Sequence, residues 1–199
     1  IICDNSNYVY SNEFVVLAQS KNKHLEILSF KGDHEKGLKY GKGFGEGELM
    51  KYVILNSSII KNYTSFFKVT GKLFIENHFL INNIKHSDFV FSFPILLFIS
   101  KKGIDLVNTT FYYARIESFK FHLLNAYLEV RDDEGIYLEH VYASYLKKLK
   151  NKKIIIKPMI PIPEVMGKSG STGDFYFKRN SLKEKIINIL LATFLIKKL

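Results

Sequence analysis

The sequence predicts an α/β fold with an open sheet, flanking helices and a C-terminal half that is mainly helical. Two observations predict this fold class. Strand-like stretches rich in β-branched and aromatic residues alternate with an amphipathic helix in the N-terminal part of the chain. Beyond Phe111 the apolar residues recur instead at helical spacing. This order favours a sheet covered by helices, with a ligand beyond the carboxyl ends of its strands.

The expected elements follow one another along the chain. Strands are predicted at residues 1–4, 24–30, 65–75 (with a turn at Gly71) and 88–93. Helices are predicted at 46–62, at 117–133, closed by Gly135, and at 137–153. The apolar faces of the first and last helices are Leu49, Met50, Val53, Ile54 and Leu138, Val141, Tyr142, Tyr145, Leu149. The loops after the first two strands are expected to end beside a glycine run.

The composition is that of one compact domain with a hydrophobic core. The 199 residues are 47% hydrophobic, and we expect a single α/β domain at 1–157, followed by a loop and a basic amphipathic helix at 158–199. A lone cysteine excludes a disulfide framework within one chain, and the six histidines lack zinc-site spacing. The chain starts without methionine inside what reads as a buried strand, so we expect that N-terminal residues, including a first strand, are missing.

The net charge of +10 lies mainly in lysines at 147–157 and near the C-terminus. A nucleic-acid surface would interleave basic and aromatic residues, and because no such module is apparent we expect no nucleic-acid partner. The segment 182–199 combines an apolar stripe with lysines. It is predicted to be a helix that either rests on an anionic membrane surface or packs on the core. The longest apolar runs, about eleven residues, fall short of the roughly 20 that span a bilayer.

The stretch "KYGKGFGEGELMKYVILNS", residues 39–57, has a glycine at every second position from 41 to 47 and then continues as the predicted helix. A glycine run before a helix can cradle a phosphate, because free N–H groups and the helix dipole point at it. The spacing matches neither the dinucleotide fingerprint nor the P-loop. The alternative is a flexible loop with a helix start at Glu46 and Glu48.

Five blocks follow one another along the chain: "ICDNS", "GKGFGEGELMKYVILNS", "FFKVTGKLFI", "VNTTFYYARIESFKFHLLNAYLEVRDDEGIYLEHVYASYL" and "GKSGSTGDFY". In this order they resemble bacterial glycosyltransferase-like proteins of capsule and lipopolysaccharide synthesis. The resemblance covers nearly the whole chain and implies a GT-A-like domain. It also implies a nucleotide-sugar donor, a saccharide or lipid-linked saccharide acceptor, and a cytoplasmic location at the membrane face.

The resemblance places donor-binding residues in the first two blocks. Gly43 and Gly45 would let the backbone approach the ribose and diphosphate, and Lys42 would add a positive charge. Asp4 would accept hydrogen bonds from the base or ribose. The alternative for Asp4 is an ordinary turn, since Asp-Asn-Ser is good loop chemistry.

The block "KVTGKL" lacks the Asp-x-Asp with which metal-dependent GT-A enzymes hold a divalent cation. Lys68 and Lys72, which flank Thr70 and Gly71, could replace the charge of the metal, so no divalent metal or other cofactor is expected. The alternative is that both are solvated strand lysines. Similar proteins have arginine at Lys72 and at Thr110, and these two departures favour a truncated or inactive homologue as the alternative function.

The acidic stretch "RDDEGIYLEH" is the predicted acceptor side. Displacement of a nucleoside diphosphate by a sugar hydroxyl needs a base, and the resemblance points to Glu139, with Asp133 or Asp132 in reserve. The alternative for all three is ordinary helix-end chemistry. The loop 167–176 could close over a diphosphate or lead into the tail. A nucleic-acid binder is the third function class, supported by charge alone.

Overall fold

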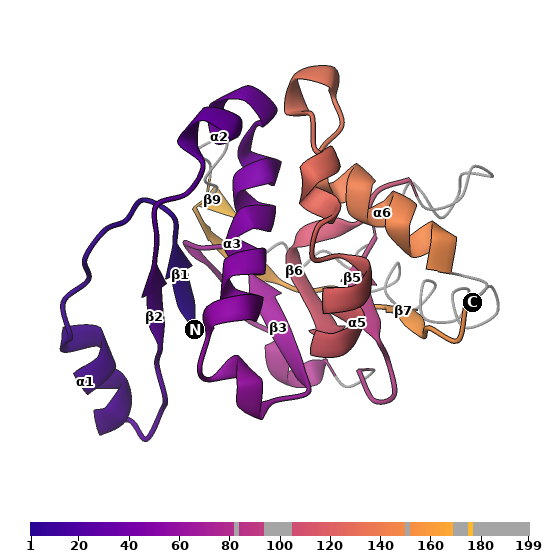
Figure 1. The fold of residues 1–199 in the computed structure, drawn as a ribbon. Helices are drawn as coiled ribbons and strands as arrows, with labels where there is room; N and C mark the ends of the chain where they lie inside the picture. Colours follow the sequence, from indigo (N-terminus) through magenta and orange to yellow (C-terminus); the bar gives the residue numbers. More distant parts are fainter. Residues whose placement is uncertain (82–83, 94–104, 150–151, 169–174, 177–199) are drawn as a thin grey trace. The chain divides into compact units, whose positions relative to one another are not determined.

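The computed structural model describes residues 1–81, 84–93, 105–149, 152–168 and 175–176 (Figure 1). The described chain has a mixed α/β fold, which confirms the predicted class. It divides into two compact units. The first unit comprises Ile1–Phe66 and Ile116–Tyr145, and the second comprises Phe67–Arg115 and Leu146–Leu199.

The first unit begins with two short strands, β1 (Ile2–Asp4) and β2 (Ile27–Ser29), which pair in parallel (Figure 1). Helix α1 (Glu13–Ser20) lies between them in the chain, as parallel strands require a crossover. Helices α2 (His34–Tyr40) and α3 (Lys42–Asn56) follow β2. Because the strands are parallel, their carboxyl ends meet at one edge of the pair.

The second chain segment of the first unit packs against α3. It contains α5 (Ile116–His122), two 3₁₀ turns and α6 (Leu138–Leu149), whose last residues belong to the second unit. The 3₁₀ turns are η3 (Ala126–Glu129) and η4 (Asp132–Glu134), and a further one, η1 (Ile60–Asn62), follows α3. The ring of Phe44 on α3 meets that of Tyr127 edge to face, with 5.1 Å between centroids. Aromatic packing of this kind fixes α3 on the later segment.

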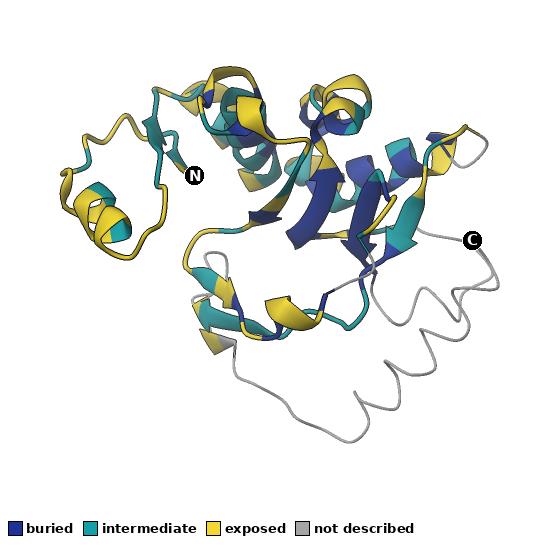
Figure 2. Cartoon of the chain, turned by 90° about the horizontal axis from the view of Figure 1, so that it is seen from below, coloured by how far each residue is buried: buried dark blue, intermediate teal, exposed yellow. Residues whose placement is uncertain are grey.

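The second unit contains two sheets. One has the order β3–β6–β5–β7, formed by β3 (Ser65–Val69), whose first two residues belong to the first unit, β6 (Asn108–Arg115), β5 (Phe89–Ser92) and β7 (Ile156–Pro158). The other is antiparallel and contains β4 (Leu73–Ile75), β8 (Val165–Lys168) and β9 (Phe175–Tyr176), with η2 (His78–Leu80) after β4. Buried residues gather on the central strands, and all of β5 is buried (Figure 2).

The predicted start of the chain is partly wrong. Ile1 lies outside β1 and is 44% exposed, and Ile2 is 47% exposed, so this strand does not begin in a buried core. In the described part of the chain β1 pairs with β2 alone. The expectation that residues precede Ile1 stays a prediction.

The predicted helix at 46–62 begins earlier and ends earlier than its pattern indicated. It starts at Lys42, so Gly43, Gly45 and Gly47 are helical while Gly41 directly precedes the helix, and the interpretation as a flexible loop is wrong. It ends at Asn56 because Ser57 is extended and its hydroxyl accepts a hydrogen bond from the Ile60 N–H at 3.0 Å. Met50 and Ile54 are buried as predicted.

The expected change to helix after Phe111 is also wrong, because β6 continues to Arg115. Residues 111–114 are all buried, so the strand lacks the two-residue alternation that would have revealed it. The predicted helix 117–133 is in fact α5 and two 3₁₀ turns. The turn at Gly71 is confirmed, since β3 ends at Val69 and β4 starts at Leu73.

Candidate functional site

The carboxyl edge of β1 and β2 is polar and begins at Asp4. Its Oδ1 accepts a hydrogen bond from the Ser6 N–H at 2.8 Å and a second, short one from the Ser6 hydroxyl. The hydroxyl of Ser6, more than any other group, holds the pKa of Asp4 below its ordinary value. The edge therefore carries a fixed carboxylate, in the turn that one interpretation of "DNS" predicted.

The loops that leave the two strands are joined by backbone hydrogen bonds. The Gly32 N–H donates to the Asn5 carbonyl at 3.0 Å, and the Asn7 N–H donates to the Phe30 carbonyl at 3.0 Å. A Cβ at Gly32 would lie 2.7 Å from Glu48 Oε2 and 3.0 Å from Asn5 Cβ, so Gly32 lies close to both residues and a side chain there would displace the Glu48 carboxylate. The loops therefore reach α3, which confirms the prediction that they end beside the glycine run.

Most of the glycine run is explained by packing against the later segment of the same unit. A Cβ at Gly41, where φ is +90°, would lie 2.0 Å from Asp132 Oδ2, and one at Gly43 would lie 3.1 Å from Leu138 Cβ. Gly47 would clash with Tyr127 at 2.0 Å. These three glycines permit close approach of the chain to itself.

Gly45 differs from the other glycines of the run because it faces the strand edge. Its added Cβ would lie 3.5 Å from Asn5 Nδ2, an ordinary contact distance. Of the residues predicted to bind the nucleotide-sugar donor, the structure therefore brings Asp4 and Gly45 to one strand edge, where Asn5 lies next to both. Lys42 is the exposed first residue of α3. The donor-binding roles of all these residues stay predictions.

The N-terminus of α3 already has an anion of its own. Oδ2 of Asp132 accepts a hydrogen bond from the Gly43 N–H at 3.4 Å, which places a carboxylate at the positive end of the helix dipole. Oδ1 of the same residue is buried and has no partner among the described residues. Asp132 thus caps α3, a helix far away in the sequence, whereas its sequence context indicated helix-end chemistry beside Gly135. It lies where a phosphate at this helix end would lie.

The residues of "KVTGKL" belong to the second unit. The ammonium of Lys68 is buried and donates to the Thr109 carbonyl and to the Thr70 hydroxyl, both at 2.7 Å. Lys68 is therefore not a solvated strand lysine. Lys72 is exposed, has a positive φ of 67° and follows the exposed Gly71 in the turn. Their predicted role as paired cations stays a prediction.

The predicted acceptor-side acids lie near the start of α6. Glu139 is its second residue and is half-buried, whereas Asp133 is exposed in η4. The neighbouring His140 has a structural role, since its Nδ1 accepts a hydrogen bond from the Tyr137 N–H at 3.2 Å. Catalysis by Glu139 or Asp133 stays a prediction.

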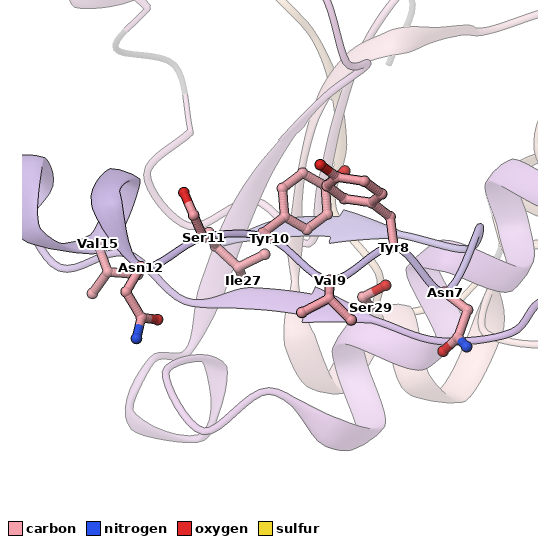
Figure 3. A pocket seen from close by; sticks show the side chains of 9 residues that line it. All are labelled: Asn7, Tyr8, Val9, Tyr10, Ser11, Asn12, Val15, Ile27 and Ser29. Carbon is pink, nitrogen blue, oxygen red and sulfur yellow. The ribbon is translucent and has the colours of Figure 1, made fainter.

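Sequence reasoning missed a pocket of about 330 Å³ on the first unit, formed by the loop after β1, the start of α1 and β2 (Figure 3). Two tyrosines, Tyr8 and Tyr10, line it, and they occur in the stretch "NSNYVYSN". Aromatic residues alternating within a polar loop are the signal that could have found it, because a loop rarely buries such side chains.

These features define a mixed α/β protein with a polar site at the carboxyl edge of a parallel strand pair. Comparison with protein-family models, curated proteins and solved structures finds no match. No helix in the described ranges is both long and apolar enough to cross a bilayer. Among the described residues, no group of three His, Cys, Asp or Glu side chains is placed to bind a metal ion.

Proposed function

We propose that this chain is a glycosyltransferase-like protein with a GT-A-like domain that binds a nucleotide-sugar donor at the carboxyl edge of β1 and β2. The observation that carries the proposal is the arrangement of Asp4, Asn5 and Gly45 at that edge. Ligands of α/β folds bind beyond the carboxyl ends of parallel strands, where loops of different strands meet. The ordered sequence resemblance supports the same class of ligand.

The chemistry of the edge suits the uncharged hydroxyl and N–H groups of a nucleoside. An ionised carboxylate such as that of Asp4 accepts hydrogen bonds from a ribose or a base. The Asn5 amide can donate as well as accept, and Gly45 presents no side chain beside it. Lys42, exposed at the start of α3, supplies a cation for the diphosphate without a metal ion.

The transfer proposed here is a direct displacement. The hydroxyl oxygen of a saccharide or lipid-linked saccharide bonds to the anomeric carbon of the donor while the bond from that carbon to the diphosphate oxygen breaks. The electron pair leaves with the nucleoside diphosphate, and the proton passes to Glu139 or Asp133. The product would be a growing capsule or lipopolysaccharide chain at the cytoplasmic membrane face.

Calorimetry with the full chain tests donor binding. Uridine and cytidine diphosphate are titrated with and without a chelator, and Asp4→Asn is compared with Glu35→Gln, which removes an exposed carboxylate elsewhere in the first unit. We expect Asp4→Asn to weaken binding about fivefold or more. Glu35→Gln and the chelator should leave the affinity unchanged.

Two outcomes would contradict the proposal. If Asp4→Asn binds the nucleotides as tightly as the unaltered chain does, the strand edge is not the binding site. If neither nucleotide binds, the chain does not use a uridine or cytidine diphosphate sugar as donor. Loss of affinity with the chelator would overturn metal independence alone, because the edge would still bind the nucleotide.

A second candidate is a nucleotide-sugar-binding homologue without transferase activity. It is favoured by the internal hydrogen bonds of Lys68 and by Asp132, which caps α3. An ammonium group that already donates hydrogen bonds to a carbonyl and a hydroxyl stabilises the charge of a leaving diphosphate less. Release of nucleoside diphosphate from a bound nucleotide sugar, measured with acceptor present, separates the two: an active enzyme releases it, and a binding homologue does not.

A further inference from the structure

The pocket beside β2 lies on the side of the parallel strand pair where the chain passes from β1 to α1. Ile27 and Ser29 of β2 form part of its lining, and the other lining residues run from Asn7 to Asn12, with Val15 of α1 (Figure 3). Its volume of about 330 Å³ is large enough for a small ring compound. All of its residues belong to the first unit.

The lining has no side chain that is charged at neutral pH. It offers two amides, Asn7 and Asn12, and the hydroxyls of Ser11 and Ser29, which can each donate and accept hydrogen bonds. The Ser29 Oγ is buried and has no partner in the part of the chain that the structure describes. A buried hydroxyl without a partner is costly, and a ligand hydroxyl would satisfy it.

Two aromatic rings complete the lining. Tyr8 and Tyr10 lie edge to face, with 4.8 Å between their centroids and 79° between their planes (Figure 3). Tyr8 is 62% exposed. Tyrosine surrounded by serine and asparagine is typical of surfaces that bind by aromatic contact and adaptable hydrogen bonding. The perpendicular rings form a corner and do not offer the two parallel faces that a planar base needs for stacking on both sides.

From this chemistry we infer that the pocket binds one neutral sugar ring. The apolar face of a sugar packs on a tyrosine, and its hydroxyls match the amides and the free Ser29 Oγ. A nucleoside diphosphate is disfavoured, because no cation lines the pocket to offset the cost of desolvating its phosphates. Sugar binding rests on the pocket alone. Identification of that sugar as the acceptor rests on the proposed function.

Saturation-transfer NMR on the full chain tests the inference, with methyl glucoside and N-acetylglucosamine as probes and glucuronate and uridine as comparisons. Binding of either neutral sugar with a weaker signal from glucuronate and uridine is expected. The variant Tyr8→Ala should weaken sugar binding about fivefold or more, and Ser29→Ala about threefold or more. Ser29→Ala should not lower the thermal midpoint and can raise it, because the buried hydroxyl that it removes has no partner among the described residues.

The matched control is Tyr63→Ala, which removes a tyrosine that is 61% exposed on the same unit but lies outside this pocket. It should bind sugar as the unaltered chain does. The inference is overturned if neither sugar binds, if uridine binds more tightly than both, or if Tyr63→Ala weakens binding as much as Tyr8→Ala. Nucleotide calorimetry with Tyr8→Ala distinguishes the sugar pocket from the nucleotide site at the strand edge. We expect this variant to lose sugar binding while its affinity for the nucleoside diphosphates stays unchanged.

Discussion

At the level of single residues, Glu26, which directly precedes β2, binds the turn that follows α3. Its carboxylate accepts hydrogen bonds from the Ser58 N–H at 2.8 Å, from the Ser58 hydroxyl at 2.7 Å and from the Ile59 N–H at 3.3 Å, together with a short one from the Ser57 hydroxyl. Partial burial alone would raise the pKa of Glu26. The hydrogen bonds outweigh burial and lower the pKa from 4.5 to about 2.

We expect Glu26→Gln to lower the free energy of unfolding by about 1 to 3 kcal/mol at pH 7, since hydrogen bonds to a charged acceptor are lost. The pKa is lower in the folded state, so the charged form stabilises the fold above pH 4.5. That contribution is lost as the pH falls from 4.5 to about 2. Urea unfolding measures the free energy of unfolding of Glu26→Gln and of the unaltered chain, and the difference between the two values should decrease as the pH falls over this interval.

The control for this series is Glu13→Gln, which removes an exposed carboxylate of α1. The free energy of unfolding of Glu13→Gln should stay close to that of the unaltered chain at every pH. A difference for Glu26→Gln that is constant from pH 7 to pH 2 would show that the carboxylate is not held in its charged form by these bonds.

Cys3 has a thiol that should react slowly. Burial first, and the charge of Asp4 second, raise the pKa of Cys3 from 9.0 to about 11. Because only the thiolate reacts, we expect alkylation at pH 8 to be about a hundredfold slower than for a thiol of pKa 9. Iodoacetamide labelling followed by mass measures this rate, and labelling in urea gives the reference. Equal rates in the two conditions would contradict the raised pKa.

At the scale of elements, α3 depends on glycines that leave room for neighbouring side chains. Gly47 lies between Phe44 and Met50 on the buried face of the helix, and a Cβ added to it would point at Tyr127. The intrinsic preference of helices for alanine, about 1 kcal/mol over glycine, is therefore overridden by packing. The close contact between α3 and η3 therefore explains why α3 contains glycine at a position where helices prefer alanine.

We expect Gly47→Ala to lower the free energy of unfolding by about 1 to 3 kcal/mol, because the new methyl would lie 2.0 Å from Tyr127 Cβ. Gly37→Ala is the matched control in α2, where an added Cβ meets nothing within 4 Å. It should be neutral or stabilising by up to about 1 kcal/mol. Chemical denaturation measures both variants, and equal stabilisation by the two substitutions would contradict the packing argument.

At the scale of the whole molecule, neither compact unit is one continuous stretch of chain. The first unit is completed by Ile116–Tyr145, which lies in the chain between β6 and β7, two strands of the second unit. Long-range contacts of this kind are invisible to local sequence patterns. The C-terminal segment from Leu182 to Leu199 lies outside the described residues, and its role stays a prediction from sequence.

We expect this segment to hold the protein on anionic membranes. Its lysines are Lys183, Lys185, Lys197 and Lys198. Each is worth about 1 kcal/mol near such a surface, so binding should be reversible and should weaken with salt. Sedimentation with anionic vesicles is compared for the full chain and for a chain that ends at Asn180. Equal binding by both would rule out the anchor, and unfolding of the shortened chain would favour a role in the core.

Features that depend on local periodicity and turn chemistry could be predicted from the amino-acid sequence alone. The burial of Met50 and Ile54 in α3, the strand β5, the turn at Gly71 and the start of α6, predicted at Tyr137 and found at Leu138, can all be inferred from neighbouring residues. Each of these signals spans only a few positions. Such a signal arises when one face of a helix is buried or when a turn uses the conformational freedom of one glycine.

The contacts of the glycines and of the charged side chains became visible in the folded chain and not in the sequence. Gly43 meets Asp132 across 89 positions of sequence, and Lys68 meets Thr109 across 41. No pattern within one segment reveals that a helix N-terminus is capped from afar or that a lysine is satisfied by a distant carbonyl. The same holds for β6, which is buried along residues 111–114 and so shows no alternation. Partners brought together by folding, and not local propensity, fixed these features.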